Sequence, residues 1–506
     1  MRKSMKTEPS QILCAGKRAA LYTALCTLAF LLIGHAFCWF NIGYSGRGVM
    51  LNLSALRGSQ ISSGSWAQPL YAALRGNLSA PMLVGLLSCL YLALTAAVAA
   101  QTLRIRARLP LTLLCGVLSL NVCVTAINAS ELHIADACFL ALLLCVLGAA
   151  IVEWGWAGTA AAAVLFGAGA ALRAPMLSAG AALLVLIALR TLLEEERPRA
   201  ALGVLGRGAL ALLAGAALHV VGYAVLTRRQ GLEWEASLQK PLGATEGGLL
   251  GAWLEPLRQL VQPMTAYRAL GGVLGALLLA GGAALLILLL RGRGRGVCAL
   301  AALLALGLPL AANLPVFAGE APSTTAQTGA YWLLTAGVLM LFDLREKRQP
   351  LGRAAGVALG AGVGVLLLSA VIFSNQVYLK RNLEQQSTLS VMTRVLDRVE
   401  KTEGYDPGVT PVALLGSLED SPLATDRAGF EHLSDFDAAQ NNFAATGMEE
   451  LTWYMWEIMG YPCNLVSYYE ADMLAQREDV QAMPVFPAAG SCQMIDGTVV
   501  VRLSGE

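Results

Sequence analysis

The amino-acid sequence predicts a mainly α-helical fold, in which a polytopic bundle of transmembrane helices precedes a small α/β domain. Hydrophobic residues make up 56% of the 506 residues and charged residues only 14%. The mean hydropathy of +0.60 is far above that of a water-soluble globule. This composition excludes a disordered chain, a secreted disulfide scaffold and a nucleic-acid-binding protein, so we expect membrane lipids and no nucleic acid as partners.

About eleven apolar runs within residues 1–373 predict a single transmembrane domain. A hydrocarbon core of about 30 Å needs roughly 20 mostly apolar helical residues to cross it. Charged clusters separate the runs from one another. The expected spans are Ala19–Phe40, Met82–Ala100, Leu109–Ile127, Ala137–Val152, Ala157–Leu172, Pro175–Leu189, Gly203–Leu226, Ala269–Leu290, Val297–Phe317, Ala330–Phe342 and Ala354–Phe373.

The distribution of basic residues predicts the orientation of these spans. Lysines and arginines concentrate in alternate connections, as in the turn with Arg291, Arg293 and Arg295. By the positive-inside rule those connections and the N-terminus lie in the cytoplasm, and an odd number of spans leaves the C-terminus outside. The first apolar run is longer than the apolar region of an ordinary signal peptide, so we interpret it as an uncleaved first helix.

Residues 374–506 have a different composition and predict an extracytoplasmic acidic domain. This tail holds 8 Lys/Arg against 20 Asp/Glu, and no part of it can span a bilayer. Its length suffices for one domain of α/β type. The expected elements are an amphipathic helix over residues 379–399, a strand at Pro411–Gly416, a helix at Met448–Tyr461, and a hairpin of Cys492–Ile495 and Thr498–Leu503 around Asp496-Gly497.

The cysteines do not indicate a metal centre. Neither CxxC nor HExxH occurs, and no other close ligand spacing is present, so no metal is predicted. Cys463 and Cys492 are the cysteines of the outer domain. In an oxidising exterior they could form one disulfide, and two free thiols are equally compatible with their spacing.

Two long outer loops stand out. The first, Asn41–Ala80, contains no Asp or Glu at all but holds arginines such as Arg47 and Arg75. The loop at residues 227–268 begins with basic residues and contains an amphipathic segment over Leu249–Val261. We expect that segment to lie flat on the outer leaflet, with Glu255 and Arg258 facing water.

The tight loop at residues 128–136 holds the candidate catalytic carboxylates, Glu131 and Asp136. A carboxylate at the mouth of a membrane helix can serve as a general base. Asp136 begins a span, so the alternative is a charge that complements the helix macrodipole. Glu131, His133 and Asp136 could also be imagined as a metal site, but a single histidine makes a solvated loop the more frequent outcome.

Arg173 lies at the outer face, in the very short connection Arg173-Ala174 between two predicted spans. The functional interpretation is a ligand for a phosphate or pyrophosphate, because a guanidinium makes bidentate, permanently charged contacts. The alternative is a side chain that snorkels to lipid head groups. His35 and His219 lie within spans, and for both we favour interhelical hydrogen bonding.

Short motifs over most of the chain resemble those of one family. They are Gly64-Ser65-Trp66 with Pro69, PMLVGLL from Pro81, Asp136 before the apolar run Ala137–Leu144, Leu172-Arg173-Ala174, PLAAN ending at Asn313, and the ending PVFP, GS and DGTVVVRLS within residues 484–504. On these motifs the chain is similar to bacterial glucosyltransferase-domain membrane proteins, which are related to serotype-converting O-antigen glucosyltransferases and broadly of the GT-C type.

The resemblance implies a multi-pass glycosyltransferase of the bacterial cytoplasmic membrane. It implies a polyprenyl-phosphate-linked sugar donor, an extracytoplasmic glycan acceptor and no cytosolic nucleotide sugar in the transfer step. No cofactor is predicted. The resemblance also marks Trp66, Pro69 and Asn313 as motif positions. The family places a catalytic acid in the first outer loop, where this chain has none, and the family's Gly-Arg-Trp and Tyr-Gln-Ala segments are altered here.

The resulting hypothesis is transfer of a glucosyl or other sugar to an envelope glycan. A carboxylate, Glu131 or Asp136, would deprotonate the acceptor, and Arg173, Arg228 and Arg229 would hold the carrier phosphate. One alternative is a transporter or flippase for lipid-linked sugars, although no half-repeat or mid-span charge favours it. A second alternative, which the acid-free first loop favours, is a catalytically inactive protein of envelope assembly.

Overall fold

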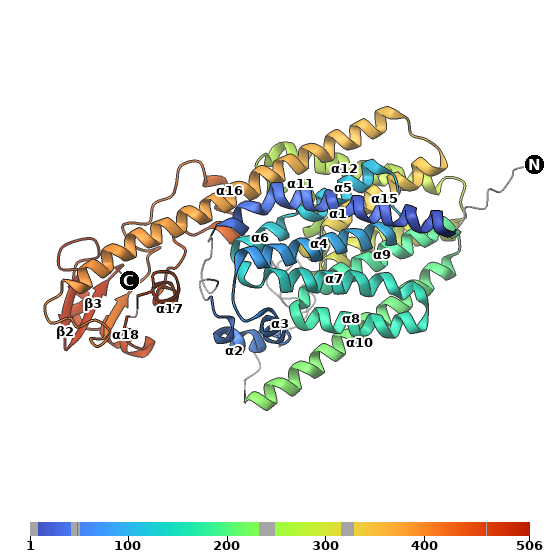
Figure 1. Cartoon of the computed structure of the whole chain (residues 1–506). Coiled ribbons are helices and arrows are strands. Elements are labelled where there is room, and N and C mark those ends of the chain that lie inside the picture. The colour runs from blue at the N-terminus through green and yellow to red at the C-terminus, as the bar shows by residue number, and fades with distance from the viewer. Residues whose placement is uncertain are drawn as a thin grey trace, which may run out of the picture.

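The computed structural model describes residues 9–41, 48, 51–231, 248–314, 328–461 and 463–505, and it is mainly helical (Figure 1). Arg47 and residues 232–247 of the outer loops lie outside the described residues. The bundle contains α1 (Pro9–Phe40), η2 (Leu53–Leu56), α2 (Arg57–Ser62), α3 (Gln68–Arg75), α4 (Pro81–Thr102), α5 (Arg108–Ser119), α6 (Val122–Ser130), η3 (Leu132–Ile134), α7 (Ala135–Ile151), η4 (Val152–Trp154), α8 (Trp156–Arg173), η5 (Ala174–Met176), α9 (Leu177–Glu195), α10 (Pro198–Gln230), α11 (Gly248–Val261), α12 (Arg268–Leu290), α13 (Arg295–Ala312), η8 (Thr328–Ala330), α15 (Trp332–Arg348) and α16 (Arg353–Glu400).

Nine helical segments among the described residues are long and apolar enough to cross a membrane. The chain is therefore a membrane protein by the length and composition of its helices. The segment Trp156–Glu195 contains two of the predicted spans, which η5 joins. The predicted span Val297–Phe317 corresponds to α13, which ends at Ala312, and residues 315–317 lie outside the described residues. The number of crossings stays a prediction.

The predicted span Leu109–Ile127 lies within the apolar segment Arg108–Ser130, which is long enough to cross a membrane. The structure divides this segment into two helices, α5 and α6. The break falls at Leu120 and Asn121. Asn121 caps α6: its Oδ1 accepts a hydrogen bond from the backbone N–H of Val124 at 3.2 Å, and its Nδ2 donates to the carbonyl of Leu118 at 2.6 Å. A side chain that satisfies these backbone groups allows the helix to stop and restart inside an apolar region.

Small residues bring α7, α8, α9 and α10 close together around Phe166. A Cβ atom on Gly180 would lie 2.5 Å from Phe166, one on Gly215 2.6 Å, and one on Gly148 3.0 Å. Glycines at these positions permit the close helix contacts that are typical of membrane bundles. This packing fixes the position of α8, whose last residue is Arg173.

The C-terminal part combines helices with a three-stranded sheet, as the sequence predicts. Its elements are β1 (Val412–Leu415), η9 (Glu431–Leu433), η10 (Asp437–Ala439), α17 (Met448–Trp453), η11 (Tyr454–Ile458), α18 (Tyr468–Ala475), α19 (Glu478–Gln481), β2 (Cys492–Ile495) and β3 (Thr498–Arg502). The strand order is β1-β3-β2, with β3 parallel to β1 and antiparallel to β2. Asp496 and Gly497 have φ of 48° and 78°, which confirms the predicted hairpin turn.

Helix α16 continues from the bundle into the C-terminal part and crosses residue 373, the predicted domain boundary, without a break (Figure 1). The C-terminal part therefore lies at the end of the bundle opposite the N-terminus. It contacts that end directly, because η10 packs against α6. Trp453 also packs against Leu53, Leu56 and Ala72 of the first loop. The first loop and the C-terminal part thus cover the same end of the bundle.

Cys463 and Cys492 are free thiols in this structure. The Cys492 sulfur lies 3.3 Å from the hydroxyl of Thr402, and Cys463 is buried. Of the two alternatives that the sequence leaves open, the structure has the unpaired one.

Candidate functional site

Two pairs of carboxylate and guanidinium groups lie at the covered end of the bundle, and the first joins Glu131 to Arg173. Glu131 follows the last residue of α6, and Arg173 ends α8. Arg173 Nη2 donates to Glu131 Oε1 at 2.8 Å, and the two side chains remain 18% and 22% exposed respectively. Two groups of the predicted site, a base and a phosphate ligand, therefore meet at one partly open position.

The second pair joins Asp136 to Arg75 and is fully enclosed. Asp136 lies in the first turn of α7, as predicted, and its side chain is 0% exposed. Arg75 Nη1 donates to Asp136 Oδ1, while Arg75 Nη2 donates to the carbonyl of His133 at 2.8 Å. The Tyr71 hydroxyl donates to Asp136 Oδ2 at 2.9 Å. Burial, followed by the charge of Asp136, raises the pKa of Tyr71, so this hydroxyl remains a donor.

The surroundings of the two candidate carboxylates suit them to different roles. Both oxygens of Asp136 already accept hydrogen bonds from the first loop, and no surface of the side chain is open. Glu131 keeps an accessible face, and its Oε2 has a weak contact with the thiol of Cys138 at 3.9 Å. Glu131 is therefore suited to meet a substrate, and Asp136 is suited to hold the first loop.

The motif residue Trp66 holds the first loop against α10, and Gln68 beside it holds the loop against α8, the helix that ends at Arg173. Trp66 Nε1 donates to His219 Nδ1 and to the His219 carbonyl, both at 3.2 Å, and the two rings stack. Two residues on, Gln68 Nε2 donates to the carbonyl of Leu172 at 2.8 Å. Pro69 occupies the first turn of α3, where its missing N–H costs nothing. The loop is thus attached immediately before Arg173.

The two membrane histidines make hydrogen bonds, as the sequence predicts. His35 Nε2 lies 2.8 Å from the Ser119 carbonyl and therefore donates to it, so that Nδ1 accepts from the Tyr378 hydroxyl at 2.6 Å. These bonds join α1, α5 and α16. The partner of His219 is Trp66 of the first loop, so that hydrogen bond joins α10 to the loop rather than to another span.

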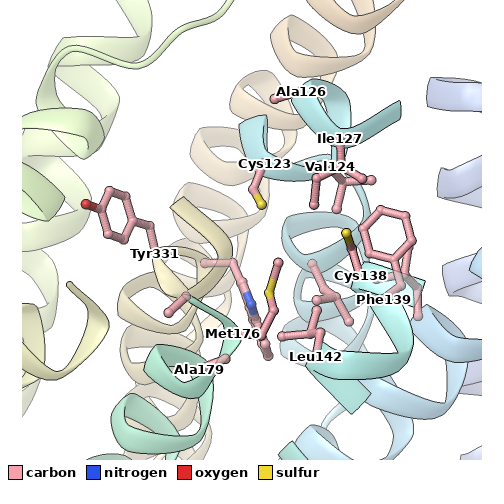
Figure 2. Close-up of a cluster of buried hydrophobic side chains, with 14 of the residues drawn as sticks. Cys123, Val124, Ala126, Ile127, Cys138, Phe139, Leu142, Met176, Ala179 and Tyr331 are labelled. Carbon is pink, nitrogen blue, oxygen red and sulfur yellow. The ribbon is translucent and has the colours of Figure 1, made fainter. Parts of the chain in front are cut away.

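A buried hydrophobic cluster supports the site from within the bundle (Figure 2). Its side chains come from α6, α7, η5, α9 and Tyr331. They include Cys123, Val124, Ile127, Cys138, Phe139, Leu142, Met176 and Ala179, all of them buried. Because this packing fixes the ends of α6 and η5 relative to each other, it also fixes the distance between Glu131 and Arg173.

The remaining predicted residues lie elsewhere. Arg228 and Arg229 are exposed in the last turn of α10, and neither contacts Glu131, Asp136 or Arg173 in the described part of the chain. Asn313 is buried: its Nδ2 donates to the Ala252 carbonyl at 2.9 Å, and its Oδ1 accepts from the Tyr331 hydroxyl at 3.1 Å. Asn313 therefore joins α13 to α11, a contact within the bundle.

The predicted amphipathic segment is helical, as α11. Its polar face is accessible to water, as predicted for Arg258, which is 69% exposed, and less fully for Glu255 at 32%. Glu255, Arg258 and Gln262 line an open cleft of about 860 Å³ against the start of α12. Arg268 and Asp435 close one side of this cleft and are joined at 2.7 Å. The cleft thus lies between the bundle and the C-terminal part.

Sequence reasoning missed Arg75 and Tyr71 as partners of Asp136. The available indication was an outer loop with arginines and no acid, in which any buried arginine needs a carboxylate from another part of the chain. Across residues 9–41, 48, 51–231, 248–314, 328–461 and 463–505, no three His, Cys, Asp or Glu side chains gather as metal ligands.

Comparison with known proteins gives no relative for this chain: no family model matches it, and neither does any curated protein.

Proposed function

We propose that this protein is an integral-membrane glycosyltransferase that moves a sugar from a polyprenyl-phosphate carrier to a glycan outside the bacterial cytoplasmic membrane. The observation that carries the proposal is the partly exposed pair of Glu131 and Arg173, whose groups lie 2.8 Å apart. Sugar transfer from such a donor needs a base for the acceptor hydroxyl and a cation for the departing phosphate, and this pair supplies both.

In the proposed reaction, an acceptor hydroxyl attacks the anomeric carbon while the bond from that carbon to the phosphate oxygen breaks. Glu131 takes the hydroxyl proton, and the electron pair of the broken bond leaves with the polyprenyl phosphate. Arg173 stabilises the charge on the departing phosphate by charge-assisted hydrogen bonds. Before the donor binds, Glu131 is held in its ion pair with Arg173. The phosphate of the donor then competes for the guanidinium and releases the base.

The buried pair has a positioning role in this proposal. Asp136 holds Arg75 and Tyr71, and through them the first loop, beside η3. Since its carboxylate is enclosed, we assign the base to Glu131 and not to Asp136. Arg228 and Arg229, which are exposed on α10, are proposed to attract the anionic carrier from a distance.

The distribution of ion pairs supports the proposed orientation. Residues from the connections assigned to the cytoplasm meet one another: Arg190 donates to Glu153 and to the Thr102 carbonyl, Arg104 pairs with Glu194 at 2.8 Å, and Arg348 donates to the Leu193 carbonyl at 2.5 Å. A basic end of this kind belongs in the cytoplasm. The Glu131–Arg173 pair and the C-terminal part then lie outside.

An apolar groove supports a lipid-linked donor. It has a volume of about 460 Å³ and lies between α12, α15 and α16, with Leu277, Leu285, Phe342, Ala358 and Leu366 among its lining residues. A groove between apolar helices that is lined by no charged side chain suits an isoprenoid chain.

The test is transfer of radiolabelled glucose from polyprenyl phosphoglucose to envelope polysaccharide in membranes that contain the protein. We expect Glu131→Gln to lower the rate by 10²- to 10⁴-fold, about the contribution of a general base. We expect Arg173→Ala to lower it by about 10²- to 10³-fold, the cost of losing one electrostatic contact to the leaving group. The matched control is Asp397→Asn, which breaks an exposed ion pair with Lys401 that is also 2.8 Å long.

Reversing the two charges of this pair distinguishes a loss of catalysis from a loss of structural stability. Glu131→Arg combined with Arg173→Glu restores the attraction but removes the base and the phosphate ligand from their places. We expect the double variant to regain the thermal stability of the wild type and to remain inactive. Full activity of Glu131→Gln and Arg173→Ala would refute the assignment of the site. If the wild type transfers no sugar from any polyprenyl carrier, the transporter or the inactive assembly protein replaces the enzyme.

A further inference from the structure

A second cleft lies entirely within the C-terminal part, against α16. It has a volume of about 470 Å³. One wall is a stripe of polar side chains on α16, namely Gln386, Ser390 and Arg394, which recur every four residues and so share one helix face. The opposite wall is the connection that contains Thr425 and Asp426.

The polar groups of this cleft have unused hydrogen-bonding capacity. In the described part of the chain, Gln386, Ser390, Thr425 and Asp426 have no hydrogen bond or ion pair with protein, and Gln386, Ser390 and Asp426 are exposed. Together they offer an amide, two hydroxyls and a carboxylate, which are both donors and acceptors. Arg394 adds a guanidinium, held by its contact with the ring of Phe486 at 5.4 Å.

The walls that carry these groups are themselves held in place. Arg427 Nη2 donates to the Leu383 carbonyl at 2.9 Å and to the Ser387 hydroxyl, which joins the connection to α16. At the other edge, Glu419 accepts from the backbone N–H of Phe443 at 3.0 Å. These bonds fix the separation of the two walls, so a ligand would need to order only the side chains of the cleft and not its backbone.

The floor of the cleft is apolar. Leu383, Val391, Leu423 and Phe443 line it below the polar rim. A sugar ring presents C–H groups on its faces and hydroxyls around its edge, so it needs an apolar surface and a polar rim at the same site. Planar amide, carboxylate and guanidinium groups can each contact two neighbouring hydroxyls. The volume falls in the range of small-ligand sites.

We infer that this cleft binds a glycan chain and presents it as the acceptor. That the bound glycan is the acceptor rests on the proposed function. That the cleft binds a glycan does not depend on sugar transfer. The cleft holds both a carboxylate and arginines, so it does not select for a purely anionic ligand such as a phosphate. The C-terminal part that contains the cleft packs through η10 against α6, the helix that Glu131 follows.

The test measures binding of polysaccharide to the full-length protein in lipid nanodiscs by biolayer interferometry. The probe is lipid-free polysaccharide that mild acid releases from the envelope of the source bacterium. The variant Gln386→Ala with Asp426→Ala removes two exposed side chains that have no hydrogen bond or ion pair in the described part of the chain, so we expect the fold to be retained. The matched control is Thr393→Ala with Asp397→Ala, which removes two exposed polar side chains of α16 outside the cleft.

We expect the cleft variant to weaken polysaccharide binding at least tenfold, because it loses several hydrogen bonds to the ligand. The control should bind as the wild type does. Equal binding by the cleft variant and the control would overturn the inference. Displacement of the probe by a peptide digest of the envelope, and not by fragments of the polysaccharide, would overturn it in favour of a peptide site.

The same proteins separate this inference from the proposed function. If the wild type transfers sugar and the cleft variant has unchanged binding and an unchanged KM for polysaccharide, the glycan cleft is refuted and the enzyme stands. If binding depends on the cleft but no variant or wild type transfers sugar, the enzyme is refuted and the cleft stands. Glu131→Gln should retain polysaccharide binding in either case.

Discussion

Arg75 supplies the charge that the buried carboxylate of Asp136 requires. The two side chains are 4% and 0% exposed, so neither can be hydrated in place of its partner. The sequence predicts Asp136 at the start of a helix, but it cannot reveal a partner 61 residues away, because that contact depends on how the first loop folds back on the bundle. Only the shortage of acids in that loop pointed toward such a pair.

Removing one partner of this pair should destabilise the protein strongly. We expect Arg75→Met to lower the free energy of unfolding by about 3–5 kcal/mol, since it leaves a charged carboxylate buried. Arg75→Met combined with Asp136→Asn removes the charge and should recover most of that loss. Thermal unfolding of the detergent-purified protein measures both. The control is Arg258→Met, which breaks a weak exposed pair with Glu255. A double variant as unstable as Arg75→Met would contradict the argument.

The two cysteines of the C-terminal part give a pH-dependent prediction. Burial raises the pKa of the Cys463 thiol to about 11, and burial also raises the pKa of Cys492. At pH 8 about one Cys463 thiol in a thousand is then ionised, and only the thiolate reacts with iodoacetamide. We therefore expect slow alkylation of Cys463 in the native protein, faster reaction as the pH rises toward 11, and rapid reaction after unfolding. Mass spectrometry of the peptides measures the rates, and a Cys463–Cys492 disulfide would show the expectation to be wrong.

At the scale of elements, apolar runs and turn residues predict the helices and the hairpin, which depend on neighbouring residues. Strand pairing depends on contacts between residues that are distant in the sequence. The runs fall on helices, and Asp496-Gly497 predicts its hairpin, because both depend on neighbouring residues. The break at Asn121 was missed, since an asparagine in an apolar run resembles any tolerated polar residue until its capping bonds are seen. The parallel pairing of β1 with β3 was equally hidden, because 82 residues lie between the end of β1 at Leu415 and the start of β3 at Thr498.

Helix α16 contains a buried charged group where it enters the C-terminal part. Glu384 is joined to Arg381 at 2.6 Å and to Lys380 at 3.4 Å. The two cations also donate to the carbonyls of Ala438, Ala439 and Asn441, three residues of the chain that crosses the helix. This group attaches the C-terminal part to the helix that leaves the bundle.

We expect Glu384→Ala to detach this connection, because it leaves two buried cations without a carboxylate. The cost should be about 3–5 kcal/mol, measured as faster hydrogen exchange and faster proteolysis around residues 437–445. Asp397→Ala breaks an exposed ion pair on the same helix and should cost at most about 1 kcal/mol. Equal protection of residues 437–445 in the two variants would show that the buried group does not hold the junction.

At the scale of the whole molecule, the two ends of α16 are enough to determine how the protein is oriented in the membrane. Its 48 residues extend for about 72 Å at the usual helical rise, more than twice the thickness of a hydrocarbon core of about 30 Å. One end, at Arg353, lies beside the basic end of the bundle, and the other carries the acidic C-terminal part. By the positive-inside rule, the basic end of such a helix lies in the cytoplasm and its acidic end lies outside.

Cysteine labelling at the two ends of α16 tests this orientation. Arg353 and Glu403 are both exposed, so Arg353→Cys and Glu403→Cys should not disturb the fold. With a membrane-impermeant maleimide on intact spheroplasts, we expect Glu403→Cys to react at once and Arg353→Cys to react only after permeabilisation. Peptide mass spectrometry distinguishes these positions from the native cysteines. The reverse pattern would place the Glu131–Arg173 pair in the cytoplasm and exclude an extracytoplasmic transfer reaction, and equal labelling without permeabilisation would mean that α16 does not cross the membrane.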